Sequence, residues 1–247
     1  MKTVFARPGI DLPPRHRGWE RLLVKRIRRR RFLGVSIVGL ATLLPEWLDA
    51  NGANATASSK VSSELEKLLK ELEATQARYY NVPRADGEFL HVLVKMARAK
   101  RVLEIGTANG YSAIWLALAL DETEGQLTTI EIQLELVRMA KANLKRAGLD
   151  RRIEFLEGDA HEGVKGLKGP FDLVFIDAEL GGKMDYFSKI YPDKLPRGGL
   201  IVCHNAIKYK SAMQDYLDFI RQHAEFDTVI LSLTMDDGFV LSYRRRR

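Results

Sequence analysis

The chain has 247 residues, of which 46% are hydrophobic, enough for one sizeable core and too many for a disordered chain. Its net charge of +7 comes from the two ends of the chain. Residues 1–55 hold 11 lysines and arginines against 4 acidic residues, and residues 56–247 hold 28 of each. The last four residues are arginines. A nucleic-acid-binding protein carries its positive stripe on the folded domain, so we expect no nucleic-acid partner.

The N-terminal region, residues 1–55, is typical of a targeting signal. Arginines at 28–31 precede a largely apolar run at 32–44, and ANA at 53–55 fits a cleavage site of the A-x-A type. The segment RRRFL at 29–33 resembles the twin-arginine signal of bacterial export. The apolar run is too short for an ordinary membrane span. We expect export, or anchoring to a membrane by this segment if it stays uncleaved; a cytoplasmic protein with a basic extension is the alternative.

The remaining region, residues 56–247, begins with two helical patterns. It continues with short apolar runs, typical of strands, that alternate with further helical patterns. Leucines at helical spacing predict an amphipathic helix over 62–80, and the segment NVP at 81–83 ends it. A second helix is predicted from Asp86 to Met96. Short apolar runs then predict strands at 101–105, 126–131, 152–157, 171–177 and 199–204, helices at 111–120, 133–147, 160–167, 185–194 and 211–223, and two final strands at 227–233 and 238–244 joined by a turn at 236–238.

Apolar strands that alternate with helices are typical of an α/β fold, a doubly wound and mostly parallel sheet with helices on both faces. The final pair of strands predicts an antiparallel C-terminal edge. In such folds the ligand lies beyond the carboxyl ends of the strands. Polar side chains end or follow all five parallel strands, and we expect a binding site there: Glu104, Glu131, Asp159, Asp177, and His204 with Asn205.

Two of these strand ends favour a nucleoside ligand. Residues 104–110 read E-x-G-x-x-x-G between a strand and a helix, where glycine permits close approach of the backbone and the helix N-terminus offers free N–H groups. The spacing differs from the G-x-G-x-x-G of dinucleotide folds. Glu131 ends the second strand, where a carboxylate can accept hydrogen bonds from both hydroxyls of a ribose.

Six segments occur in the order typical of small S-adenosylmethionine-dependent O-methyltransferases, and the chain resembles the catechol and caffeoyl-CoA O-methyltransferase group over residues 60–245. The resemblance implies a Rossmann-like class I fold with a seven-stranded sheet and N-terminal helices, S-adenosylmethionine (SAM) as cofactor, and, by analogy alone, a homodimer. The segments are VLEIGTANGYSAIWLALAL, TTIEI, GDA, FDLVFIDA, GGLIVCHN and DDGFVLSYR.

The resemblance also implies roles for individual residues. The loop after the first strand would lie against the methionine part of SAM, Ser112 would hold its carboxylate, and Glu131 would bind its ribose. Asp159 and Ala160 would meet the adenine, and Asn81 and Val82 would close over the cofactor. The cofactor-binding residues implied in this way are Asn81, Val82, Glu104, Gly106, Thr107, Gly110, Ser112, Glu131, Asp159, Ala160 and Asp177.

The residues at the expected catalytic positions differ from those of that group. In its cation-dependent members a strand-ending Asp binds a metal ion, here Asp177, and the next strand ends in Asp-Asn, here His204-Asn205. The position of their basic Lys is here Leu180. Mg²⁺ prefers oxygen ligands, whereas a nitrogen donor suits Zn, Mn, Fe or Co. Either Asp177, His204 and Asn205 hold a divalent cation, or His204 is itself the general base.

We therefore predict an enzyme, a SAM-dependent O-methyltransferase, that acts on a hydroxyl of a small acceptor, expected to be aromatic and catechol-like, with Asp177 and His204 as catalytic residues. Use of a divalent cation stays open. The alternatives are a metal-independent methyltransferase with His204 as base, and a non-catalytic SAM- or nucleoside-binding domain. Lys183, beside two glycines, is expected to be a solvated loop residue.

Overall fold

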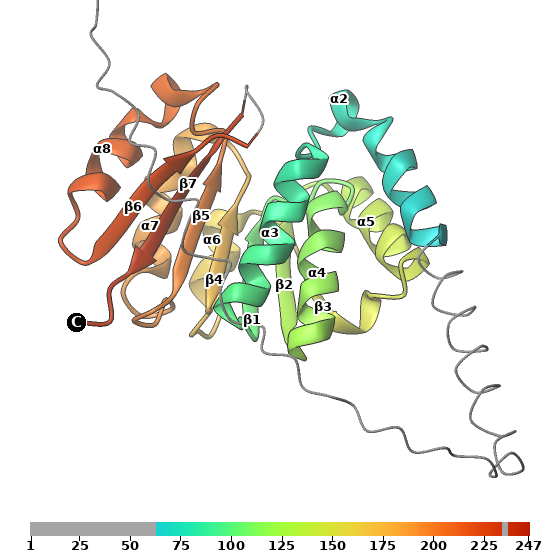
Figure 1. Ribbon diagram of the computed structural model, residues 1–247, viewed down its shortest axis with the longest axis horizontal. Coiled ribbons are helices and arrows are strands. Elements are labelled where there is room, and N and C mark those ends of the chain that lie inside the picture. The colour runs from blue at the N-terminus through green and yellow to red at the C-terminus, as the bar shows by residue number, and fades with distance from the viewer. Residues whose placement is uncertain (1–62, 234–236) are drawn as a thin grey trace, which may run out of the picture. The chain divides into compact units, whose positions relative to one another are not determined.

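The computed structural model describes residues 63–233 and 237–247 (Figure 1). The predicted export signal at 28–55 lies outside these residues, as does part of the turn predicted at 236–238. None of the helices in the described ranges is both long and apolar enough to cross a lipid bilayer.

Seven strands form one sheet in the order β3-β2-β1-β4-β5-β7-β6. The first five pair in parallel, and β7 pairs antiparallel with both β5 and β6, which confirms the predicted fold class. The strand order reverses between β1 and β4, which makes their carboxyl ends the switch point of the sheet. The strands are β1 (Arg101–Ile105), β2 (Gln126–Glu131), β3 (Ile153–Glu157), β4 (Leu173–Ile176), β5 (Leu200–His204), β6 (Phe226–Leu231) and β7 (Phe239–Arg244).

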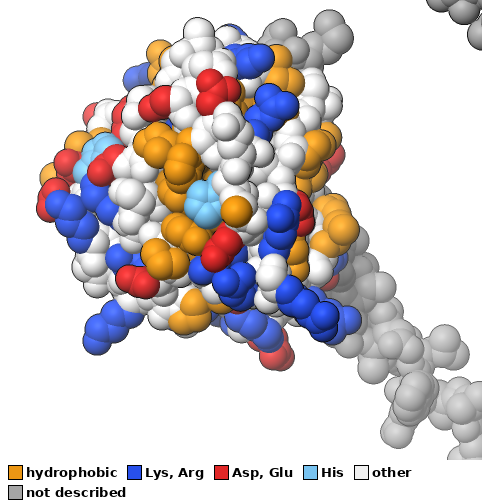
Figure 2. Space-filling model, turned by 90° about the vertical axis from the view of Figure 1, so that its left-hand side faces the viewer, with side chains coloured by type: hydrophobic (Ala, Val, Ile, Leu, Met, Phe, Trp, Pro, Cys, Tyr) orange, Lys and Arg blue, Asp and Glu red, His pale blue; other side chains and the backbone are white. Residues whose placement is uncertain are grey.

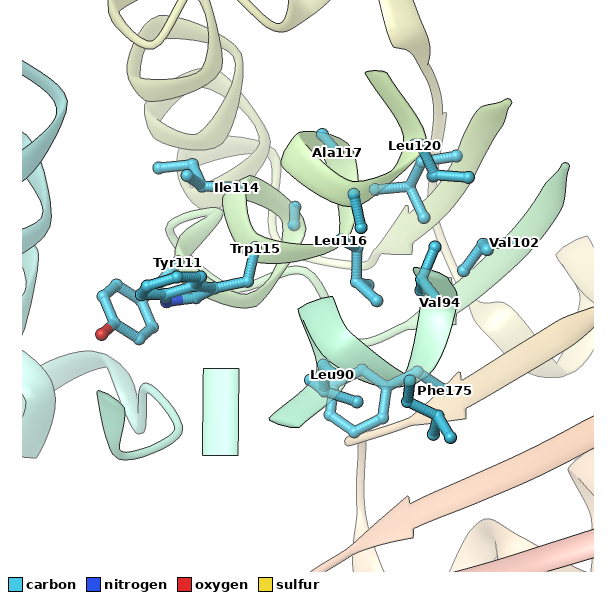
Figure 3. Close-up of a cluster of buried hydrophobic side chains, with 14 of the residues drawn as sticks. Leu90, Val94, Val102, Tyr111, Ile114, Trp115, Leu116, Ala117, Leu120 and Phe175 are labelled. Carbon is cyan, nitrogen blue, oxygen red and sulfur yellow. The ribbon is translucent and has the colours of Figure 1, made fainter. Parts of the chain in front are cut away.

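Helices cover both faces of the sheet, and each face has its own core (Figure 1). Alternate strand residues point to opposite faces: Val102 packs with α3 and α4 in one core, and Leu103 packs with α6, α7 and α8 in the other. Figure 3 shows the first core, with Leu90 and Val94 facing Phe175. The helices are α2 (Gln76–Tyr79), α3 (Arg84–Ala97), α4 (Tyr111–Thr123), α5 (Leu134–Arg146), α6 (Ala160–Gly166), α7 (Lys183–Ile190) and α8 (Gln214–Gln222).

The single helix predicted over 62–80 is wrong, because the described part of it consists of one helix at 63–73 and the short α2. The carbonyl of Leu72 accepts hydrogen bonds from the Thr75 hydroxyl at 2.8 Å and from the Asn81 amide at 3.0 Å. Side chains thus take the acceptor that a continuous helix would use for its own backbone. The break turns the chain so that Asn81 and Val82 reach the carboxyl edge of the sheet.

Other boundaries shift by a few residues. The helix predicted at 185–194 is α7, which ends at Ile190 before Pro192, a residue without an amide proton. The helix predicted at 211–223 is a 3₁₀ turn, η3 (Lys210–Met213), followed by α8. Two further 3₁₀ turns, η1 (Asp150–Arg152) and η2 (Leu180–Gly182), precede β3 and α7.

Aromatic rings pack together where α7 and α8 meet. Five ring residues contact one another there: Phe187, Tyr191, Phe219, His223 and Phe226. Figure 2 looks at the molecule from the side of β6 and α8 and shows hydrophobic side chains gathered around a histidine, with acidic and basic side chains interspersed around them. This cluster fixes the outer helices of the second core, away from the carboxyl ends of β1 and β2.

Candidate active site

A cavity of about 500 Å³ opens at the carboxyl ends of the parallel strands. Nine of the eleven residues predicted to bind the cofactor line it, whereas Glu104 and Gly110 do not. Segments far apart in the sequence, from residue 79 to residue 209, meet around this one space. The nine residues are Asn81, Val82, Gly106, Thr107, Ser112, Glu131, Asp159, Ala160 and Asp177.

The loop after β1 lies directly against the loop after β4. Gly106 has φ +95°, and a Cβ atom built there would lie 2.3 Å from the carbonyl oxygen of Asp177. The Gly106 amide donates to the carbonyl of Ile130 at 3.0 Å, so the same residue also fixes the loop to β2. Only glycine allows this approach, and the cavity wall at the switch point depends on it.

Glu104 lies beneath the cavity rather than in its wall. Its two carboxylate oxygens accept hydrogen bonds from the hydroxyls of Ser112 and Thr129, each at 2.6 Å, and the Thr129 hydroxyl lies 2.5 Å from that of Thr107. Burial raises the pKa of Glu104 to about 7. Gly110 contacts α5 instead, where its Cβ would lie 3.1 Å from Ala140. Both residues support the loop that forms the wall.

Glu131 presents an oriented carboxylate to the cavity. One oxygen accepts from the amide of Ala108 and the other from the amide of Gln133, both at 2.9 Å. Each carboxylate oxygen can accept a second hydrogen bond. The side chain is therefore held so that it can receive two neighbouring hydroxyl groups of a ligand, as predicted for a ribose.

A charged cluster closes the other end of the cavity. Asp159 accepts from the amide of His161 at 2.8 Å and caps α6. The His161 ring stacks on Tyr186 at 4.5 Å and lies between Asp185 and Glu179, with Nε2 2.8 Å from Glu179. Tyr186 and Glu179 both line the cavity. His161 therefore ties α6 to the loop that follows Asp177.

The stability supplied by His161 should decrease as the pH rises. The contact with Asp185, and then that with Glu179, raises the pKa of His161 above its ordinary value. The charged imidazole therefore stabilises the fold fully below about pH 6.5, and this stability is lost as the pH passes through the raised pKa. We expect the difference in Tm between the wild type and His161→Gln to be largest near about pH 6 and to shrink towards about pH 9. A difference that is constant with pH would contradict this assignment.

At the catalytic end, His204 lies between two carboxylates. Its Nε2 is 2.8 Å from Oδ2 of Asp86, a hydrogen bond across 118 residues of sequence, and its Nδ1 is 3.4 Å from Oδ1 of Asp177. The side chains of His204 and Asp86 are 3% and 1% exposed, and that of Asp177 is 16% exposed. Asp86, in the first turn of α3, was predicted only as the start of a helix.

The two carboxylates require a positive charge between them. Burial alone would lower the pKa of His204, but the charges and hydrogen bonds of Asp177 and Asp86 outweigh it and raise the pKa to about 10. Burial likewise opposes ionisation of Asp177, yet His204 and then Lys183 lower its pKa. An imidazole between two carboxylates is a poor general base at neutral pH, so this geometry does not favour the role of base for His204.

The described residues contain no group of three His, Cys, Asp or Glu side chains that could hold a metal ion, so a divalent cation here would need the amide of Asn205 beside Asp177 and His204. Two ligands bonded to one cation at about 2.1 Å lie roughly 3.0–3.4 Å apart, which matches the distance from Nδ1 of His204 to Oδ1 of Asp177. Asn205 lines the same cavity with φ +71°. Asp177, His204 and Asn205 are thus brought together as predicted, although their binding of a metal stays a prediction.

Lys183 is not the solvated loop residue that was expected. It is 1% exposed, and its ammonium group donates to the carbonyl of Ala178 at 3.0 Å. Leu180, at the position of the absent basic Lys, lines the cavity. Lys183 therefore lies beneath the Asp177 loop rather than in the open cavity, whereas Lys208 lines the adjoining hollow beside His204 and Asn205.

A second hollow of about 460 Å³ adjoins the first. The two share Tyr80, Asn81, Asn205 and Tyr209, and the second is also lined by His204. Tyr80 is 86% exposed and Tyr209 is 40% exposed, so two aromatic rings stand at its mouth. The hollow gives a second ligand access to the end of the cavity where Asp177 and His204 lie.

Comparison with known proteins identifies the family. The sequence model of the O-methyltransferase family matches residues 55–242. The chain is 34% identical over 173 residues to catechol O-methyltransferase of Mycobacterium tuberculosis (64% of this chain, 78% of the relative), and 32% identical over 149 residues to caffeoyl-CoA O-methyltransferase of Medicago sativa (56% and 60%). The crystal structure of the Bacillus cereus O-methyltransferase in complex with SAH superposes with a TM-score of 0.66 at 28% identity, over 74% of this chain and 91% of that one.

The family match covers most of the chain, and the fold superposes on that of a solved O-methyltransferase. The resemblance seen in the sequence is therefore confirmed. The chain belongs to the O-methyltransferase family, as a class I SAM-dependent O-methyltransferase of the catechol and caffeoyl-CoA O-methyltransferase group.

Proposed function

We propose that this protein transfers the methyl group of SAM, bound in the 500 Å³ cavity, to a hydroxyl of a small aromatic acceptor. The observation that carries the proposal is the Glu131 carboxylate, which the amides of Ala108 and Gln133 hold in the cavity wall. Its free lone pairs are placed for the two hydroxyls of a ribose. The relative from Bacillus cereus contains SAH, the demethylated form of SAM, in its structure.

The other residues of the cavity would each contact a different part of the cofactor. Gly106 and Thr107 lie where the methionine part would pass the switch point, and Ser112 stands beside them on α4. Asp159 and Ala160 face the opposite end, where the adenine would lie at the start of α6. Asn81 and Val82, from the other side of the cavity, would cover the bound cofactor.

The second hollow suits a flat acceptor. The rings of Tyr80 and Tyr209 at its mouth offer faces for stacking, an arrangement that favours an aromatic ligand over a flexible aliphatic one. Asp177 and His204 lie where the two spaces meet. An acceptor held there would present its hydroxyl to the sulfonium end of the cofactor.

The chemistry needs alignment and an oxygen that is close to ionised. SAM, when bound, would supply an electrophilic methyl group: the S–CH₃ bond would break as the O–CH₃ bond forms, sulfur would keep the electron pair as the thioether of SAH, and the hydroxyl proton would pass to water. The positive charge between Asp86 and Asp177 lowers the pKa of a hydroxyl placed beside it. A divalent cation held by Asp177, His204 and Asn205 would supply that charge more strongly than the imidazole, and we infer that the transfer uses one.

The test uses the full chain, stripped of metal. We expect methylation of catechols or hydroxycinnamoyl esters to stop in EDTA and to return with an added divalent cation. Activity unchanged in EDTA would instead make the charged imidazole the source of positive charge. Tight SAM binding with no turnover on a broad panel of acceptors would favour the non-catalytic alternative.

The variant Glu131→Gln tests whether Glu131 binds the ribose of SAM. The amide removes one of the two acceptors and the negative charge, so we expect the Kd for SAM to rise by about 10–100-fold, measured by isothermal titration calorimetry. Glu157→Gln is the matched control, because Glu157 ends the neighbouring strand in register with Glu131 but is paired with Lys141 outside the cavity. Equal SAM affinity of the wild type and Glu131→Gln would refute the assignment.

A further inference from the structure

Asp86 is a buried carboxylate for which neither the cofactor nor the acceptor accounts. It lies in α3, is 1% exposed, and has the imidazole of His204 as hydrogen-bond partner of its Oδ2 atom. Its Oδ1 atom has no hydrogen-bond partner among the described residues. A buried carboxylate that is only partly satisfied costs stability, so packing does not explain why an acidic residue occupies this position.

The contact with Asp86 determines which nitrogen of the His204 imidazole faces Asp177. Because Nε2 donates to Asp86, Nδ1 is the nitrogen that faces Asp177. Phe239 packs against the ring of His204, with 5.0 Å between centroids, and restricts its rotation. The 3.4 Å from Nδ1 to Asp177 exceeds the length of about 2.7–2.9 Å typical of a charge-assisted hydrogen bond, and suits two ligands of one cation.

We propose that Asp86 is the positioning residue of a divalent-cation site formed by Asp177, His204 and Asn205, and that the imidazole makes this site select Zn²⁺ or Co²⁺ over Mg²⁺. A carboxylate that accepts the second N–H of a metal-binding histidine fixes its tautomer and ring orientation and increases its donor strength. Mg²⁺ requires an oxygen shell, whereas an imidazole nitrogen suits borderline transition metals. The inference rests on the proposed function for a cation at Asp177, His204 and Asn205, and adds the role of Asp86 and the choice of metal.

Charge supports the assignment. Asp86 and Asp177 bring two negative charges into a nearly dry site, and the imidazolium of His204 balances only one of them. One divalent cation that takes the place of the imidazolium proton would balance both carboxylates. The third ligand of the cation would be the amide oxygen of Asn205, which lines the same cavity.

The experiment measures metal binding without an acceptor, on the full metal-free chain. Isothermal titration calorimetry with ZnCl₂, CoCl₂ and MgCl₂ gives stoichiometry and affinity, and the visible spectrum of Co²⁺ reports its ligands. We expect one Co²⁺ or Zn²⁺ per chain and an affinity for Mg²⁺ at least about tenfold weaker. Asp86→Asn keeps the shape of the side chain and should weaken Co²⁺ binding by about 10–100-fold while leaving the Kd for SAM unchanged.

Two further variants keep the proposal falsifiable. Asp172→Asn is the matched control, because Asp172 accepts from the amides of Lys100 and Arg101 at the opposite end of the strands, and its Co²⁺ affinity should equal that of the wild type. The double variant Asp86→Asn/His204→Asp replaces the imidazole nitrogen by a second carboxylate beside Asp177 and removes the Asp86 carboxylate that would repel it. It should shift the preference towards Mg²⁺ and alter the Co²⁺ spectrum.

The failures of this inference and of the proposed function are distinguishable. A wild type that binds SAM and methylates an acceptor, but binds no Co²⁺ or Zn²⁺, would overturn the inference and leave methyl transfer intact. Equal Co²⁺ affinity of Asp86→Asn and the wild type would remove the positioning role of Asp86. Metal binding as expected, but no SAM binding, would refute the proposed function instead.

Discussion

Replacing Asp86 by alanine should lower the free energy of unfolding by about 3–5 kcal/mol. The substitution removes the carboxylate that accepts from Nε2 of His204 at 2.8 Å, and it leaves a charged imidazole, 3% exposed, with one of its two partners missing. A buried charge that loses its partner cannot recover the lost interaction from water. Urea unfolding of the wild type and the variant at neutral pH measures the difference.

Asp185→Ala provides the matched control for this loss. Its carboxylate also pairs with a histidine, His161, and with Lys189, but it is 44% exposed. Water screens such a pair, so we expect a loss of no more than about 1 kcal/mol. The double variant Asp86→Ala/His204→Ala should lose less than the two single variants added together, because it leaves no unpaired imidazole. A loss below about 1 kcal/mol for Asp86→Ala would show that solvent reaches the pair.

The fold could be predicted because its signals are local. Apolar runs such as 171–177 and 199–204 are buried on both faces of the sheet, so they read as strands whatever their neighbours are. The helix over 62–80 was different. Its end depends on the Leu72 carbonyl, which is captured by Thr75 and by Asn81 nine residues away, and helical spacing does not report that competition.

The site could be predicted where the strand-end rule applies. Glu131 and Asp177 line the cavity because parallel strands bring their carboxyl ends to one edge. Asp86 could not be found this way, since an acidic residue in the first turn of a helix is ordinary and its contact with His204 spans 118 residues. Lys183 was misjudged because neighbouring glycines indicate a loop but do not reveal that the side chain turns inward to Ala178.

Replacing Gly106 by alanine should lower the free energy of unfolding by about 2–4 kcal/mol and weaken SAM binding. The residue has φ +95°, which an alanine adopts only with strain. The added Cβ would lie 2.3 Å from the carbonyl oxygen of Asp177 and 2.8 Å from its carbonyl carbon. Both are backbone atoms, so no side-chain rotation relieves the contact, and the loop that carries Asp177 has to move.

Gly148→Ala separates the cost of the positive φ from the cost of the contact with the backbone of Asp177. Gly148 also has a positive φ, +72°, but its Cβ would meet nothing within 4 Å, so this variant should lose only the conformational cost of about 1 kcal/mol and bind SAM normally. The excess loss in Gly106→Ala then measures the close approach of the two loops. Because the displaced loop carries Asp177, whose Oδ1 lies 3.4 Å from Nδ1 of His204, the same variant should also weaken Co²⁺ binding. Equal behaviour of the two variants in urea unfolding, SAM titration and Co²⁺ titration would show that the loops around Gly106 tolerate a methyl group and that their contact does not hold the site together.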